Sequence, residues 1–227
     1  MLENLISLRH LLTCLQTLPY FRVNRDRGCK IEELGGLSNL KGKIIIRNLE
    51  DVTSKEEAKK ANLSKKSNIQ DLKLHWGYES REQEEYNDEE VLEGLQPHSN
   101  LKGLTIKNFQ GERFASWITM ARSTMLLNNL VKIKLVTCFR CKEIPTLGQL
   151  PLLKEVYIDG MNNVERIGSE FYGGASGSAL PVFPTLKRLT LRYMEKLVEW
   201  LEVSMPGLAS TGMVFPSLET LGICDCP

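Results

Sequence analysis

A regular spacing of apolar residues recurs along this chain and restricts the folds that it can adopt. The segment "NLKGLTIKNF" carries Leu101, Leu104, Ile106 and Phe109, which is the pattern L-x-x-L-x-L-x-x-N/C with phenylalanine at the last position. We call the two apolar residues of the central L-x-L the first and second anchors. First anchors recur at residues 44, 72, 104, 133, 156, 189 and 221, at intervals of 28, 32, 29, 23, 33 and 32 residues.

The anchors predict a stack of short parallel strands. Residues two apart in a strand point to the same face, so both anchors of one copy face one side and the residue between them faces the other. One copy cannot bury its own apolar face, but stacked copies bury a continuous core. The spacing therefore predicts an α/β leucine-rich-repeat solenoid, a horseshoe with a parallel concave β-sheet and an irregular or short-helical convex side. We expect one domain over 1–227 with about seven or eight irregular repeats, the first a degenerate copy that begins with Leu15 and Leu18.

Two spacers between the strands carry helix signals. Ser54 and Glu57 have the spacing of a capping box, which predicts a helix from about 54 to 66. The segment "NDEEVLEGL" predicts a second short helix that stops near Pro97. Both helices are expected on the convex side.

Composition excludes several classes of protein. The formal charge of +1 does not fit a globally basic nucleic-acid binder. The start, "MLENLISLRHLL", lacks a secretory layout, and no apolar stretch reaches the ~18 residues that a membrane span needs. Six cysteines are too sparse for a disulfide scaffold. We expect a cytoplasmic protein, with a nuclear pool allowed, that binds no nucleic acid and has no membrane span.

The cysteines have two interpretations. Cys138 and Cys141 are three apart, as in a metal half-site or a redox dithiol, and Cys224 and Cys226 form a second pair. However, Cys138 and Cys226 each follow a second anchor by three residues, where the repeat favours Asn or Cys with an inward side chain. The two pairs are almost three repeats apart. We therefore expect a scaffold role for Cys138 and Cys226, an incidental place in a turn for Cys141, and no metal or cofactor.

Catalytic chemistry is not indicated. The histidines are His10, His75 and His98, and none stands beside a Ser or Cys in a recognised catalytic motif. His75 is expected to be exposed on the concave side of its strand. The carboxylates of "EQEEYNDEE" are interpreted as a solvated acidic run. The chain is not expected to be an enzyme.

The residues that flank the anchors predict a binding face. They include eight Lys or Arg residues and three acidic ones, Asp71, Glu155 and Asp159. A basic concave stripe favours an acidic protein partner through salt-sensitive attraction, and the alternative is that these are merely solvated side chains. The predicted partner-binding residues are Lys43, Arg47, Lys73, His75, Thr105, Lys107, Lys132, Lys134, Tyr157, Asp159, Arg188 and Arg192.

Longer stretches resemble a known family. The segment "GCKIEELGGLSNLKGKIIIRNLEDV" (28–52) resembles the start of the leucine-rich repeats in plant disease-resistance proteins of the coiled-coil, nucleotide-binding, leucine-rich-repeat class. "VLEGLQPHSNLKGLTIKNFQGERFASWI" and "FPTLKRLTLRYMEKLVEW" continue the resemblance, which covers nearly the whole chain.

The resemblance implies a role in defence against pathogens. Such receptors recognise a pathogen effector directly or through a guarded host protein, and their repeats fold back on their own nucleotide-binding module and hold it inactive. This chain has no G-x-x-x-x-G-K-[ST] loop, so ADP or ATP is expected only in a full-length member. We expect a fragment without the coiled-coil and nucleotide-binding modules. The alternative is a free-standing adaptor or decoy that binds a host protein without a nucleotide switch.

Overall fold

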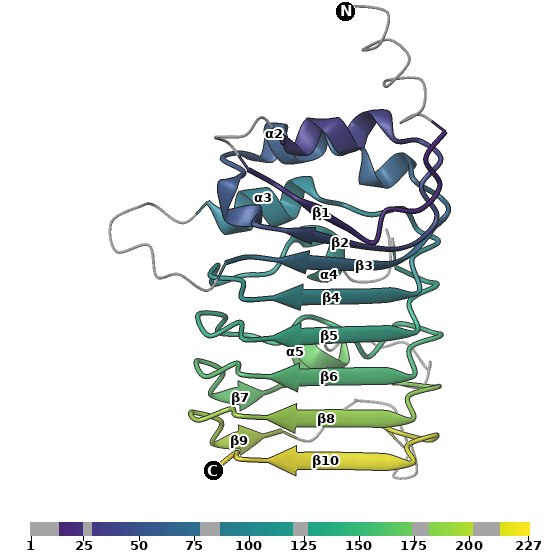
Figure 1. Ribbon diagram of the computed structural model, residues 1–227. Helices are drawn as coiled ribbons and strands as arrows, with labels where there is room; N and C mark the ends of the chain where they lie inside the picture. Colours follow the sequence, from purple (N-terminus) through teal and green to yellow (C-terminus); the bar gives the residue numbers. More distant parts are fainter. Residues whose placement is uncertain (1–13, 25–28, 78–86, 120–126, 174–181, 202–213) are drawn as a thin grey trace, which may run out of the picture.

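The strands stack in chain order into one parallel sheet. The computed structural model describes residues 14–24, 29–77, 87–119, 127–173, 182–201 and 214–227. Within these residues eight strands pair in the order β1-β2-β3-β4-β5-β6-β8-β10 (Figure 1). Their bounds are β1 Tyr20–Arg22, β2 Gly42–Arg47, β3 Ile69–His75, β4 Gly103–Lys107, β5 Lys132–Val136, β6 Glu155–Asp159, β8 Arg188–Arg192 and β10 Thr220–Cys224. The predicted α/β solenoid with a parallel sheet is confirmed.

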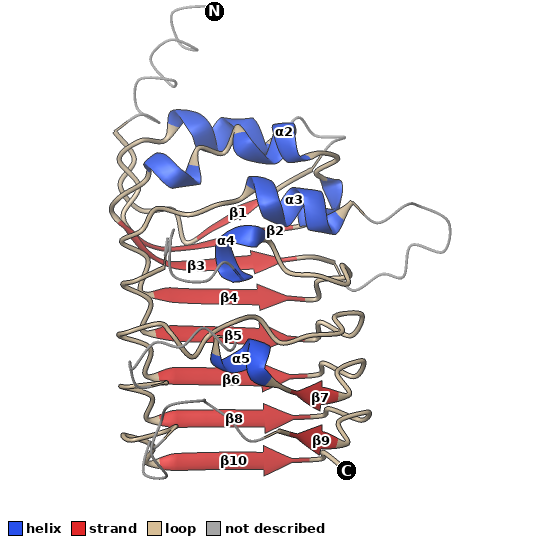
Figure 2. Ribbon diagram, turned by 180° about the vertical axis from the view of Figure 1, so that it is seen from behind, coloured by secondary structure: helices blue, strands red, loops and turns tan. Residues whose placement is uncertain are grey.

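Short helices cover the back of the sheet. Figure 2 shows α4 and α5 in front of the strands, on the side opposite to that seen in Figure 1, and α2 at the amino-terminal end of the stack. A small second sheet pairs β7 (Arg166–Ile167) with β9 (Glu199–Trp200) on the spacers. The helices are the 3-10 turns η1 Ile31–Gly36, η2 Leu49–Asp51 and η3 Leu63–Lys65, and the α-helices α2 Lys55–Lys59, α3 Asp88–Gly94, α4 Ser116–Thr119 and α5 Ser169–Tyr172.

The strand register follows the anchors. Seven predicted first anchors pair directly from strand to strand, in the order Ile44, Leu72, Leu104, Ile133, Val156, Leu189 and Leu221. The first six are at most 2% exposed, because a neighbouring repeat covers each of them. Leu221 lies on β10 at the edge of the sheet and is 52% exposed. Burial of each anchor therefore depends on the next repeat.

A left-handed turn ends most strands. The residue two positions after the second anchor has a φ between 49° and 75° in six repeats, at Asn48, Asn108, Thr137, Gly160, Tyr193 and Asp225. In four of these repeats its amide N–H donates to the last residue of the next strand, as in Asn108 N to Val136 O (2.9 Å) and Thr137 N to Asp159 O (2.7 Å). Asn and Gly tolerate this backbone conformation best. For the other residue types, the hydrogen bond offsets part of the conformational free energy that a positive φ costs.

Polar side chains form a ladder where the strands begin. The residue just before the first leucine of a repeat donates to a backbone carbonyl of the preceding repeat. The bonds are Asn100 Nδ2 to Ser67 O (3.2 Å), Asn129 Nδ2 to Ser99 O (3.0 Å), Thr185 Oγ1 to Pro151 O (3.0 Å) and Ser217 Oγ to Pro184 O (2.9 Å). Leu152 occupies the same position in the remaining repeat of this series and is 44% exposed. The ladder satisfies carbonyls that the sheet leaves unpaired.

The first predicted helix is shorter than expected. Helix α2 ends at Lys59, because Asn62 adopts a left-handed φ of 52° and the chain continues as the 3-10 turn η3. Ser54 Oγ accepts from Glu57 N (3.2 Å), as the capping box predicts. The Glu57 carboxylate accepts from Thr53 N (2.9 Å) rather than from the N-cap residue. The second predicted helix is confirmed as α3.

A lysine is buried behind the sheet. Lys66 is 2% exposed, and its Nζ donates to Leu37 O at 2.8 Å. No carboxylate of the described residues forms an ion pair with it. Burial lowers the pKa of Lys66 below its usual value of 10.5, because desolvation disfavours the charged form.

We expect Lys66 to make stability depend on alkaline pH. Between its lowered native pKa and 10.5, the unfolded chain binds one more proton than the native chain, so the free energy of unfolding rises with pH. Lys66→Met removes this contribution, whereas Lys65→Met on the exposed neighbour leaves it in place. Urea unfolding from neutral pH to pH 10.5 measures it. If the free energy of unfolding changed with pH by the same amount in the wild type and in Lys66→Met, Lys66 would not be the cause.

Two alanine substitutions in the same register, one at a buried anchor and one at an exposed anchor, test how much burial stabilises the anchors. Leu104→Ala is expected to lower the free energy of unfolding by about 2–5 kcal/mol, because it leaves a cavity in a closed core. Leu221→Ala in the same register is expected to cost about 1 kcal/mol or less, because its side chain is already half exposed. Urea midpoints of the two variants measure the difference. Equal losses would show that burial by the next repeat does not stabilise the anchors.

Candidate functional site: the open face of the sheet

The residues between and beside the anchors form the face of the sheet that is opposite to the helices. We call this surface the open face. The strand register arranges it in three rows. The first row is Lys43, Asp71, Gly103, Lys132, Glu155, Arg188 and Thr220. The middle row is Tyr20, Ile45, Lys73, Thr105, Lys134, Tyr157, Thr190 and Gly222, and the last row is Arg22, Arg47, His75, Lys107, Val136, Asp159, Arg192 and Cys224.

All twelve predicted partner-binding residues lie in these rows, and none of them is buried. Sequence reasoning missed Tyr20 and Arg22, which lie on β1 beside Ile45 and Arg47. Pro19 stands where the first anchor of that repeat belongs and hides the pattern. Phe21, which pairs with the second anchor Ile46, was the signal that could have found them.

In the carboxyl-terminal half of the open face, the basic residues have acidic or phenolic partners. Lys132 Nζ lies 2.6 Å from Glu155 Oε1, and Arg188 Nη2 lies 3.4 Å from Glu155 Oε2. Burial alone would raise the pKa of Glu155, but these two cations outweigh it and the pKa is lowered. Lys132, Glu155 and Arg188 are adjacent in the first row, so an anion sits between two cations.

The same half holds a second polar cluster. Tyr157 Oη donates to Asp159 Oδ2 at 2.7 Å, and Arg192 Nη1 lies 3.4 Å from Tyr157 Oη. The bond to Asp159 raises the pKa of Tyr157. Lys134 Nζ lies 4.9 Å from the centre of the Tyr157 ring, a cation–π distance. These contacts are made within the chain.

The amino-terminal half of the open face has no ion-paired cation among its described residues, although Arg47 Cζ lies 5.8 Å from the centre of the Tyr20 ring on β1. Among the described residues, Arg47, Lys73 and Lys107 have no ion pair within 4.0 Å. The one acidic residue in the rows of β1 to β4 is Asp71. Its negative charge partly offsets the effect of the neighbouring cations on the pKa of Lys73. Burial, followed by repulsion from Lys43, lowers the pKa of Lys73. The basic stripe is therefore concentrated on β1 to β4.

His75 differs from its expected exposure. It is half-buried, because Arg47 and Lys107 flank it on both neighbouring strands. Burial lowers its pKa to about 4, with further lowering by the charges of Lys107, Arg47 and Lys73. The imidazole is therefore neutral at pH 7 in the free chain.

Cys138 and Cys141 lie in the core and Cys226 packs against it, whereas Cys14, Cys29 and Cys224 are exposed. Cys138 is buried with its Sγ 3.7 Å from Val136 O, and Cys226 Sγ lies 3.9 Å from Leu191 O in the equivalent position. Cys141 is not an incidental turn residue: it is fully buried and its thiol donates to Gly111 O at 3.3 Å. Burial raises its pKa well above the usual value. In the described ranges, no group of three His, Cys, Asp or Glu side chains is placed to hold a metal ion.

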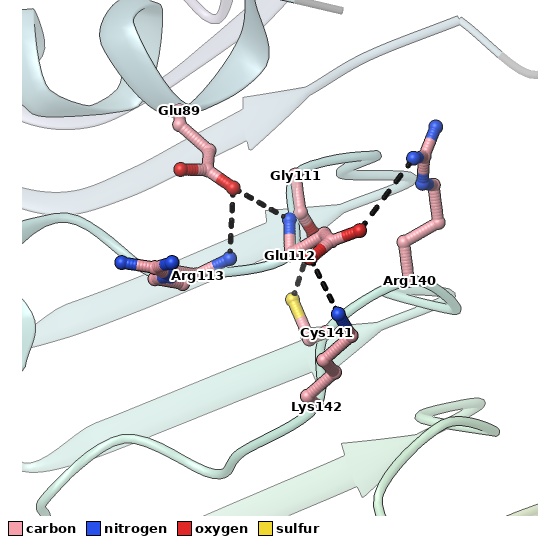
Figure 3. Close-up of polar contacts among 7 residues, drawn as sticks. All are labelled: Glu89, Gly111, Glu112, Arg113, Arg140, Cys141 and Lys142. Carbon is pink, nitrogen blue, oxygen red and sulfur yellow. Dashed lines mark hydrogen bonds and ion pairs between the residues drawn. The ribbon is translucent and has the colours of Figure 1, made fainter.

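The acidic segment behind the sheet is only partly solvated. Residues 78–86 lie outside the described residues, but three carboxylates of α3 accept hydrogen bonds from the spacer after β4. Glu89 Oε1 accepts from the backbone N–H of Glu112 (2.8 Å) and Arg113 (3.1 Å) (Figure 3). Asp88 accepts from Gln110 N (3.0 Å), and Glu93 accepts from Ser116 N (2.7 Å). The interpretation as a solvated run was wrong for Asp88 and Glu89, which together with Glu93 fix the next repeat.

The contacts continue into the following repeat. The Glu112 carboxylate lies 2.7 Å from Lys142 Nζ and 3.8 Å from Arg140 Nη2 (Figure 3). Cys141 stands between these two basic residues in the chain, and its bond to Gly111 runs beside them. Three successive repeats are thereby tied together behind the sheet, so the open face is held on a connected scaffold.

Glu93 offers a test of these contacts. Burial alone would raise its pKa, but the bonds from Ser116 and the charge of Lys55 outweigh it and lower the pKa below 4.5. Glu93→Ala is expected to cost about 1–3 kcal/mol at pH 7, because buried donors lose their acceptor, whereas Glu90→Ala on the exposed neighbour costs little. The stabilisation is present above pH 4.5 and is lost as pH falls through the lowered pKa. Urea unfolding of the wild type and both variants at several pH values measures this stabilisation. A difference in the free energy of unfolding between the wild type and Glu93→Ala that persists below the lowered pKa would refute it.

Comparisons with known proteins agree with this architecture. The family described as "R13L1/DRL21 LRRs" matches residues 31–161. The chain is 34% identical over 217 residues to a putative disease resistance RPP13-like protein 1 of Arabidopsis thaliana, which covers 91% of this chain and 20% of that protein. It is 36% identical to the putative disease resistance protein RGA4 of Solanum bulbocastanum (96% of this chain, 21% of that protein) and 36% identical to the disease resistance protein RGA2 of the same species (95% and 21%).

The chain thus spans about a fifth of the length of these relatives. No solved structure gives a significant match. Within the described residues, no helix is long and apolar enough to cross a bilayer. The family match covers more than half of the chain and coincides with strands β2 to β6, so the chain belongs to the R13L1/DRL21 family of leucine-rich repeats, whose relatives named above are plant disease resistance proteins.

Proposed function

We propose that this chain is a protein-recognition region of a plant immune receptor and acts in defence against pathogens. The names of its relatives support the biological setting. The observation that carries the recognition role is the uncompensated charge on β1 to β4 of the open face. Side chains on a regular sheet are held in fixed rows, so a partner meets a pre-arranged surface and loses little freedom in ordering it. The role is binding rather than catalysis.

We further propose that the same face contributes to autoregulation. In a longer protein the amino-terminal repeats would dock an acidic surface of the nucleotide-binding module and favour its inactive state. ADP or ATP would then bind that module and not this chain. A pathogen effector or a guarded host protein would compete for the open face, and the expected place of action is the cytoplasm. The concentration of basic residues at the amino-terminal end of the sheet supports this geometry.

The proposal predicts that reversing three charges abolishes binding. The variant Lys73→Glu, Lys107→Glu, Lys134→Glu is expected to lose most of the proteins that the wild type captures from plant extract at low salt, because like charges then face the acidic partner. The matched control reverses Lys59, Lys65 and Lys154, which are exposed outside the three rows.

Quantitative mass spectrometry at low and high salt measures the capture, and circular dichroism checks that both variants fold. Proteins that bind through the open face are lost from the triple variant, are retained by the control, and are also lost by the wild type at high salt. If the triple variant captures the same proteins at both salt concentrations, the open face is not the binding surface.

A further inference from the structure

Four basic or donor side chains lie on adjacent strands in one part of the open face. Arg47 on β2, His75 on β3 and Lys107 on β4 stand directly opposite one another in register. Lys73 lies two residues before His75 on the same face of β3. Neighbouring strands are about 4.8 Å apart, so the long side chains of Arg47 and Lys107 are within reach of a ligand above His75. The Arg47 guanidinium, which lies 5.8 Å from the Tyr20 ring in the free chain, would turn toward that ligand. We call these four residues the His75 cluster.

The cluster has charge of one sign. Arg47, Lys73 and Lys107 are basic side chains, and no carboxylate of the described residues forms an ion pair with them. Arg47 has a neutral partner instead, the Tyr20 ring at 5.8 Å. The repulsion acts on the cluster itself, because each of these three charges lowers the pKa of His75. An arrangement with unpaired like charges is stabilised by any anion that reaches its centre.

The carboxyl-terminal half of the same face contains the complete version of this arrangement. Lys132, Glu155 and Arg188 also stand in direct register on three adjacent strands, and the central Glu155 carboxylate lies 2.6 Å and 3.4 Å from the two flanking cations. In the His75 cluster the central position holds a neutral imidazole instead of a carboxylate. The anion that would complete it must come from another molecule.

We propose that the His75 cluster binds the phosphate group of a phosphorylated serine or threonine in a protein partner. This inference rests on the proposed protein-recognition function and names the chemistry of the partner. A carboxylate carries one charge, whereas a phosphate monoester carries −1.5 to −2 and offers three acceptor oxygens. Three cations and one imidazole N–H match that charge and number of acceptors better, and the planar Arg47 guanidinium can donate two parallel hydrogen bonds to it.

His75 gives the site a direct spectroscopic signal. The charged groups that face it are Arg47 from β2, Lys107 from β4 and Lys73 from its own strand. A bound dianion reverses the sign of the field that these cations impose, so the imidazole takes up a proton on binding. Its pKa, about 4 in the free chain, is therefore expected to rise when phosphate occupies the cluster.

The test uses histidine-detected NMR titrations of the chain at constant ionic strength. The probes are a short neutral peptide with one phosphoserine, the same peptide with serine, the same peptide with glutamate, and inorganic phosphate. We expect saturable shifts of the His75 ring and a raised His75 pKa with the phosphopeptide, and about tenfold weaker binding of the glutamate peptide. Lys107→Gln is expected to lose the effect, whereas Lys154→Gln retains it.

Several outcomes would overturn the inference. Equal binding of the phosphoserine and glutamate peptides would remove the preference for phosphate. Binding of inorganic phosphate as tight as that of the phosphopeptide would assign the site to a free ion. An equal loss in Lys154→Gln would show that any surface lysine contributes as much.

A second experiment separates this inference from the proposed function. The extract is treated with phosphatase before capture, and mock-treated extract serves as the control. If the partner is lost both after phosphatase and from the triple reversal variant, both stand. If phosphatase removes the partner but the triple reversal variant still captures it, both fall, because the phosphate is then bound outside the open face. If the partner is still captured after phosphatase but is lost from the triple reversal variant, protein recognition by the open face stands and the phosphate inference falls. If neither treatment nor variant changes capture, both fall.

Discussion

The burial of two aliphatic side chains on each of the strands β2 to β6 and β8 is the interaction on which the rest of the structure depends. Each first anchor pairs with the anchor of the next repeat, and six of the seven are at most 2% exposed. Because side chains alternate along a strand, burying the anchors forces every intervening residue onto the open face. The core therefore determines where a functional surface lies, but it leaves the chemistry of that surface free.

The arrangement of charges on the open face differs between its two ends. Near β6 and β8, Glu155 neutralises two cations and Asp159 engages Tyr157. Near β2 to β4, the cations around His75 have no such counter-charge among the described residues. A chain with a formal charge of +1 thus carries a strongly polarised surface. Net charge alone would have given a poor guide to its partners.

The anchors, the parallel sheet and the positions of the open-face residues were predictable from sequence, because they follow from local alternation and a repeat. Contacts between repeats were not. The pairing of Lys132 with Glu155 and the carboxylate of Glu89 on the backbone of the next repeat join residues more than 20 positions apart. The end of α2 depended on the left-handed backbone of Asn62, and the depth of His75 depended on two neighbouring strands. Such features require the packing itself.

The two ends of most strands are fixed separately, by the ladder of polar side chains where the strand begins or by the left-handed turn where it ends. The distance between successive first anchors varies from 23 to 33 residues, yet their pairing never slips from β2 to β10. Spacers of different length are therefore accommodated behind the sheet with the anchors still paired, and a register shift occurs only at Gly42/Lys43 among the described strand pairs of this sheet. During evolution, the spacers behind the sheet can therefore lengthen and the residues of the open face can be substituted as independent changes.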